Sequence, residues 1–201
     1  MPARGRKDVA KWRVVDILVA VVLGVACGLI FFVWNSAGYA WYEAMNALTP
    51  GFGGVAVGIW LLGGVLGGLI IRKAGAAVFV EVLAAIVSAL LGNQWGIETL
   101  WSGLAQGLGA ELVFLIFAYR HFNIVNSISA GIGAAWGAFV IELLVFGNLA
   151  KGATFNLIYL ISLTISGAIL AGVVGFILMR ALAATGALDR FAAGREQRKL
   201  V

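Results

Sequence analysis

Charged side chains are scarce in this chain of 201 residues: Asp, Glu, Lys and Arg together make up 11% of it. Soluble domains usually carry about 25% charged residues. Hydrophobic residues make up 62% of the chain, and its mean hydropathy is +1.03. This composition indicates an integral protein of the cell membrane. The apolar runs leave no room for a second sizeable domain, so we predict a single membrane domain over residues 1–201.

Cysteine and histidine are almost absent as well. Cys27 is the only cysteine and lies inside an apolar run, so the sequence offers neither a disulfide nor a thiolate metal site. His121, the only histidine, stands beside Arg120 without a serine nucleophile or a second metal ligand in an obvious arrangement. We therefore expect no metal, no cofactor and no enzymatic activity.

Nucleotide and nucleic-acid signatures are missing too. No lysine stands in a G-x-x-x-x-G-K-[ST] context, which excludes ATP hydrolysis through a P-loop. The glycine-rich stretch GIGAAWG, residues 131–137, has the wrong spacing for a dinucleotide fingerprint. The formal net charge is +5, but the basic residues lie at the ends and in short turns rather than in one stripe. No nucleic-acid partner is expected.

Six apolar segments are long enough to cross a bilayer, which takes about 20 residues. The breaks RKAG and RHFN are so short that the segments on either side must form tight antiparallel hairpins. We predict an all-α integral membrane protein, a six-helix transmembrane bundle over residues 14–180 with basic flanks at 1–13 and 181–201. The segments cover approximately residues 14–34, 52–71, 74–92, 101–119, 124–147 and 155–179.

The basic residues also predict an orientation. Thirteen of the fourteen Lys and Arg residues fall on one side of the predicted bundle, and only Lys151 falls on the other. Cytoplasmic segments carry the excess of Lys and Arg. Both termini are therefore predicted to be cytoplasmic, and three loops, at residues 35–54, 93–98 and 147–154, are predicted to face outward.

Four carboxylates lie within or beside the predicted helices: Glu81, Glu98, Glu111 and Glu142. A charge at the bilayer centre costs about 3 kcal/mol on insertion scales, so each should face protein, water or a ligand. With a rise of about 1.5 Å per residue, Glu81 and Glu111 are expected at an inner level, apart from Glu98 and Glu142 at an outer level. We interpret the inner pair as structural or coupling carboxylates.

Amides, hydroxyls and aromatic rings gather around the outer pair. Such groups suit a small, flat, cationic or amine-bearing molecule through charge-assisted hydrogen bonds and cation–π contacts. Two alternatives stay open, because aromatic residues collect at membrane interfaces without a ligand and the carboxylates could belong to a structural hydrogen-bond network. The predicted substrate-binding residues are Asn35, Tyr42, Asn93, Gln94, Trp95, Glu98, Gln106, Trp136, Glu142, Asn156 and Tyr159, with Tyr39, Trp41, Glu43 and Ser102 in the same surroundings.

Several stretches resemble a known family. WRVVDILVAVVLG, GIW, RKAGAAVFVEVLAAIVSALLGNQWG and GLAQGLGAELVF are similar to the S components of energy-coupling factor (ECF) vitamin transporters, in the YkoE-type subgroup associated with thiamine or its hydroxymethylpyrimidine moiety. The likeness covers residues 12–180. It implies that the chain captures the vitamin at the outer face while a separate T component and two ATPase subunits drive uptake, which fits the missing P-loop.

The resemblance also implies roles for individual positions. The small residues of the first helix that contact the T component in the family correspond to Ala20, Gly24 and Gly28, although small residues four apart also serve ordinary helix packing. The first outer loop would close over the ligand as a lid. Glu98 and Trp136 stand at places comparable to the glutamate and tryptophan that read the vitamin in related S components.

Two further functions remain open. A stand-alone secondary transporter would use Glu81 and Glu111 as a proton relay, but no repetition between residues 1–100 and 101–201 supports it. A non-transporting membrane scaffold would use the outer polar cluster for structure alone.

Overall fold

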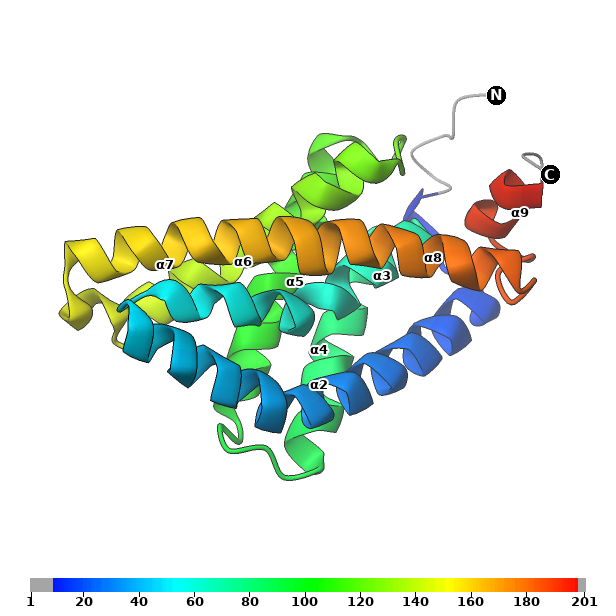
Figure 1. Ribbon diagram of the computed structural model, residues 1–201. Helices are drawn as coiled ribbons and strands as arrows, with labels where there is room; N and C mark the ends of the chain where they lie inside the picture. The colour runs from blue at the N-terminus through cyan, green and yellow to red at the C-terminus, as the bar shows by residue number, and fades with distance from the viewer. Residues whose placement is uncertain (1–8, 199–201) are drawn as a thin grey trace.

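The computed structural model describes residues 9–198, and within this range it consists of helices and connecting turns without a strand (Figure 1). The elements in chain order are α2 (Val14–Leu48), η1 (Phe52–Leu61), α3 (Leu62–Ile71), α4 (Ala76–Leu90), α5 (Glu98–Ile116), α6 (Ile124–Leu144), η2 (Asn148–Lys151), α7 (Ala153–Ser166), η3 (Gly167–Val173), α8 (Val174–Ala184) and α9 (Ala192–Arg198).

The apolar helices correspond to the six predicted segments. In the described part of the chain, five helical stretches are long and apolar enough to cross a membrane, namely 14–48, 52–71, 98–116, 124–144 and 153–184. The helix α4 is also apolar but has only 15 residues. The prediction of an all-α membrane protein is confirmed, whereas the number of crossings and their orientation stay predictions.

The first helix is longer than predicted. α2 continues without interruption through residues 35–48, for which the sequence predicts the start of an outer loop that acts as a lid. This stretch contains four alanines and no proline, so it has high helix propensity. The helix ends only where Thr49 adopts an extended conformation just before Pro50. The loop prediction is therefore wrong here, because the segment forms a helical wall.

The second segment begins as a ten-residue 3₁₀ helix, η1, which is long for this type. Serines of α7 hold it in place: Ser162 Oγ donates to the Gly51 carbonyl at 2.9 Å, and Ser166 Oγ accepts from the Gly58 amide at 2.9 Å. A Cβ on Gly58 would collide with the Ser166 carbonyl oxygen. Glycine therefore lets η1 pack backbone to backbone against α7 in the centre of the bundle.

The small residues of α2 pack inside the molecule. Ala20, Gly24 and Gly28 are buried, and added Cβ atoms on the two glycines would lie 2.7 Å from Leu83 Cδ2 and 2.6 Å from Val87 Cβ of α4. In lipid, small residues permit this close approach of helices. In this conformation α4 covers the stripe, and its contact with a T component stays a prediction.

The C-terminal segment folds back onto the bundle rather than forming a free basic tail. Figure 1 shows α9 at the same end as the start of α2. Arg72, left-handed at the end of α3 with φ 56°, donates to both carboxylate oxygens of Glu196 at 2.7 Å. Its guanidinium also lies 4.4 Å over the ring of Phe122. This ion pair fastens α9 to the turn between α3 and α4.

Candidate functional site

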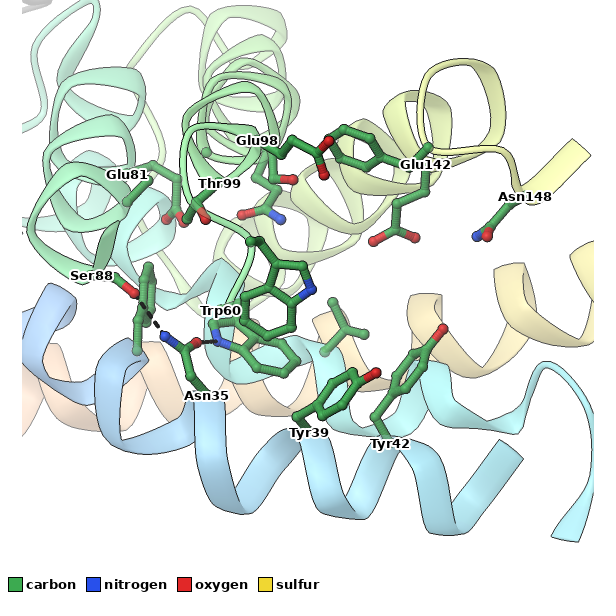
Figure 2. Close-up of a pocket in the computed structure, with 18 of the residues that line it drawn as sticks. Asn35, Tyr39, Tyr42, Trp60, Glu81, Ser88, Glu98, Thr99, Glu142 and Asn148 are labelled. Atoms are coloured by element: carbon green, nitrogen blue, oxygen red, sulfur yellow. Dashed lines mark hydrogen bonds between the residues drawn. The ribbon is translucent and has the colours of Figure 1, made fainter. Parts of the chain in front are cut away.

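A cavity of ≈410 Å³ opens in the half of the molecule away from α9, and its size is typical of small-molecule sites. Figure 2 shows its walls, which come from α2, η1, α4, α5, α6, α7 and the loops that join them. The lining residues are Phe31, Asn35, Tyr39, Tyr42, Glu43, Val57, Trp60, Glu81, Ala85, Ser88, Trp95, Glu98, Thr99, Ser102, Gly103, Gln106, Glu142, Phe146, Asn148, Lys151 and Tyr159.

Five aromatic rings form a continuous chain along the cavity. Trp60 and Trp95 meet edge to face at 5.6 Å, and Trp95 meets Tyr39 in the same way at 5.6 Å. Tyr39 stacks on Tyr42 at 6.0 Å, and Tyr42 meets Tyr159 edge to face at 6.3 Å. Rings in such contacts hold one another in place and leave faces for a flat or cationic ligand.

Asn35 fixes the side chain of Trp60 at the floor of the cavity. Its amide nitrogen donates to Ser88 Oγ at 2.9 Å, and its oxygen accepts from Trp60 Nε1 at 2.8 Å. Asn35 is only 6% exposed, so both groups are satisfied inside the protein. It thereby ties α2, η1 and α4 together and fixes the Trp60 ring.

Asn93 shapes the loop between α4 and α5. Its oxygen accepts from the backbone amides of Trp95 at 3.1 Å and Gly96 at 2.8 Å, and its nitrogen donates to Thr99 Oγ1 at 2.8 Å. Gly92 and Gly96 have positive φ, 93° and 54°, which favours glycine at both ends of the loop. Asn93 does not line the cavity; it places Trp95 there.

Glu142 of α6 is partly exposed as a residue, but its carboxylate brings one buried oxygen to the cavity. Its Oε2 is shielded from solvent and has no hydrogen-bond partner among the described residues. The carboxylate interacts with the hydroxyl of Tyr159 and, over a longer range, with Lys151. Figure 2 shows it turned into the cavity, across from Tyr39 and Tyr42. An unpaired buried acceptor is costly, and a ligand that donates a hydrogen bond would remove this cost.

Glu81 lines the same cavity as Glu98 and Glu142, whereas the sequence places it at an inner level apart from them. Figure 1 shows α4 running across α2. Glu81 is 1% exposed, and its Oε2 accepts from the Gly64 amide at 2.5 Å. Its Oε1 lies 3.2 Å from the Gln106 side-chain nitrogen in the amide orientation that pairs donors with acceptors.

Glu111, the other inner carboxylate, caps the N-terminal end of α4. It accepts from the backbone amides of Gly75 at 2.6 Å and Ala77 at 2.9 Å, and from the hydroxyl of Tyr119 at 2.5 Å. A carboxylate at a helix N-terminus satisfies free amides and the helix dipole. Burial and the bond to Glu111 raise the pKa of the Tyr119 hydroxyl above its ordinary value. These contacts favour a structural role for Glu111 over a coupling role.

The cavity gathers seven of the eleven predicted site residues. Glu98 lies at its exposed mouth, whereas Gln106 and Tyr159 are buried. The seven come from four helices and one loop that are distant in sequence: Asn35, Tyr42, Trp95, Glu98, Gln106, Glu142 and Tyr159.

The other four predicted residues lie outside the cavity. Asn93 shapes its loop, and Gln94 is exposed. Asn156 donates to the carbonyls at 148 and 152, both at 2.8 Å, and so closes the turn before α7. Trp136 is 56% exposed and bonds to Thr164 Oγ1 at 3.1 Å on the outside of α6 and α7. Trp136 precedes Glu142 by six residues, which places the two side chains about 120° apart around the helix, so they do not share a face.

Trp60, Ser88, Thr99, Asn148 and Lys151 line the cavity but are absent from the predicted site. The sequence could have indicated Trp60, since an indole N–H within an apolar segment needs a hydrogen-bond acceptor. The short polar loop that holds Asn148 and Lys151 is predicted to face outward together with the site. Ser88 carried no signal, because a single serine in an apolar helix is common.

Comparisons with known proteins cover most of the chain. The family described as "ABC-type cobalt transport system, permease component" matches residues 15–137. A protein of Bacillus subtilis (strain 168) that carries the name HMP/thiamine permease protein YkoE is 35% identical over 192 residues, which cover 94% of this chain and 93% of that protein. A crystal structure of an S component of an ECF transporter superposes with a TM-score of 0.79 at 31% identity and covers 94% of both chains.

Proposed function

Because this chain belongs to the YkoE-type S components of ECF transporters, we propose that it binds thiamine or its hydroxymethylpyrimidine precursor at the outer face for ATP-driven uptake. It is a multi-pass protein of the cell membrane. Energy would come from two separate ATPase subunits through a T component. The similar proteins are transporter components rather than enzymes, which fits the expectation of no catalysis.

The single observation that carries this proposal is the unpaired Glu142 oxygen beside the chain of aromatic rings. The aminopyrimidine of both candidate ligands has an exocyclic amine that can donate to Glu142. The thiazolium of thiamine is a flat cation, which aromatic faces attract. Trp60, Trp95 and Tyr39 offer such faces on the opposite wall. The binding energy would then come from one charge-assisted hydrogen bond and ring stacking.

The two alternatives gain no support from the site. A proton relay through Glu81 and Glu111 would need both carboxylates free to exchange protons, but Glu111 is engaged with two backbone amides and Tyr119. A purely structural cluster would pair its polar groups internally, as Asn35 does. Glu142 differs from Asn35, because its buried Oε2 has no hydrogen-bond partner among the described residues.

Equilibrium binding to the purified protein tests the proposal. We expect submicromolar association with thiamine or hydroxymethylpyrimidine in isothermal titration calorimetry. Ligand at 100 times the Kd should stabilise the folded state by about 2.7 kcal/mol, measurable as a higher Tm. If neither compound binds nor raises the Tm, the proposed ligand class is wrong. Uptake by this chain alone in vesicles under a pH gradient would support the proton-coupled alternative instead.

A further inference from the structure

We infer that two exposed carboxylates at the cavity mouth, Glu43 and Glu98, steer cations into the site, while Lys151 opposes them, so that ligand charge sets the association rate. This inference rests on the proposed function of the cavity as a ligand site. Such steering would favour cations over neutral rings during association, before the ligand contacts the floor of the cavity.

The charged side chains that line the cavity fall into two groups. Glu81 and Glu142 lie deep, where Glu81 is bonded to Gly64 and Glu142 interacts with Tyr159. Glu43, Glu98 and Lys151 also line the cavity, but all three are exposed to solvent. Among the described residues, neither Glu43 nor Glu98 takes part in an ion pair. No ion pair therefore neutralises their negative charges, which lie at the opening of the cavity.

The negative electrostatic potential at the cavity mouth does not come from the rest of the molecule. The chain as a whole has a formal charge of +5, and thirteen of its fourteen basic residues are predicted to lie on the opposite side of the bundle. An approaching cation thus meets a local negative region on a protein whose net charge is positive. Charged clefts of one sign raise the local concentration and association rate of the opposite charge.

The expected size follows from the dimensions of the cavity. A sphere of its volume, ≈410 Å³, is about 9 Å across, and one unit charge at about this distance in water changes the local concentration of a monovalent ion about two-fold. The Debye length is about 30 Å at 0.01 M salt and about 3 Å at 1 M. Each mouth charge should therefore change the association rate about two-fold in low salt and not at all in 1 M salt.

A purely structural role of Glu43 and Glu98 predicts a different result. Glu98 is in the first turn of α5, where a carboxylate stabilises the helix dipole, and Glu43 interacts with the hydroxyl of Tyr39. If these contacts were all that the two residues do, Glu98→Gln and Glu43→Gln would lower the Tm and would leave the salt dependence of binding unchanged.

Stopped-flow association rates of thiamine, a cation, and hydroxymethylpyrimidine, neutral at pH 8, separate these cases. In 10 mM salt, the Glu43→Gln/Glu98→Gln double variant should associate with thiamine about four-fold more slowly, and Lys151→Gln about two-fold faster. Hydroxymethylpyrimidine rates should not change, and all variants should converge in 1 M salt. Equal effects on both ligands, or none on thiamine, would overturn the inference.

A second measurement keeps the inference testable if neither compound binds, which would refute the proposed function alone. Trp95 lines the cavity, so the fluorescence difference between the wild type and Trp95→Phe reports on access to the mouth. Quenching of this signal by Cs⁺ in low salt should weaken about four-fold in the double variant, while quenching by neutral acrylamide stays constant. Unchanged Cs⁺ quenching would overturn the inference.

Discussion

Glu142→Gln should weaken ligand binding and at the same time leave the empty protein as stable as before or more so. Without ligand, Glu142 Oε2 is buried and has no hydrogen-bond partner among the described residues, so glutamine replaces a shielded carboxylate oxygen and loses no described partner there. The Tyr159 hydroxyl can still donate to the amide oxygen. We expect the free energy of unfolding of the empty protein to stay equal or to rise by about 1 kcal/mol.

The ligand complex should respond in the opposite direction. A hydrogen bond to a charged group contributes about 1.5–3 kcal/mol, so loss of the carboxylate should raise the Kd about 10-fold to 100-fold. The effect should be similar for thiamine and hydroxymethylpyrimidine, because both carry the aminopyrimidine. Calorimetry gives the Kd, and thermal unfolding with and without ligand gives both stabilities in one preparation.

A matched control comes from Glu111→Gln, which removes a carboxylate bonded to Gly75, Ala77 and Tyr119 outside the cavity. That variant should lower the Tm of the empty protein and leave the Kd unchanged. If Glu142→Gln instead behaves like the control, with lower stability and wild-type affinity, then Glu142 is structural and its open oxygen does not bind the ligand.

Three further substitutions test the roles of other side chains. Asn93→Ala should raise the Kd about five-fold by calorimetry, since the loop that presents Trp95 loses hydrogen bonds worth about 1 kcal/mol net; an unchanged Kd would mean that Trp95 does not contact the ligand. Trp136→Phe should leave the Kd within two-fold, because this ring is 56% exposed outside the cavity; a large loss of affinity would contradict that placement. Glu196→Gln should destabilise the protein by about 1–3 kcal/mol in thermal unfolding, because it leaves the buried Arg72 without its ion-pair partner; an unchanged Tm would show that α9 does not depend on this contact.

Helical phase decides which of the two predicted site residues on α6 lines the cavity. Its buried face carries Ala130, Ala134 and Ala138, four residues apart, and this series leads to Glu142. Trp136 is off this face, and only its nearness to Glu142 in sequence favours it as a site residue. A helical count along α6 alone separates the two residues.

Composition and local pattern determined that this is an all-helical membrane protein, because the cost of placing charge and unpaired backbone in lipid depends on the sequence of each segment alone. The sequence pattern also predicted many of the polar residues that line the cavity, since they lie in or near the breaks between apolar segments. The resemblance of residues 12–180 to the YkoE-type S components is confirmed by the comparisons.

Only the tertiary structure decided which of these groups face one another. The packing of α4 brings Glu81 to the cavity, the bond from Trp60 to Asn35 fixes the ring at its floor, and Asn93 turns Trp95 inward. Each depends on crossing angles and on partners distant in sequence, which no periodicity encodes. The same packing leaves one oxygen of Glu142 without a partner among the described residues, because the residues around it meet only in the folded bundle.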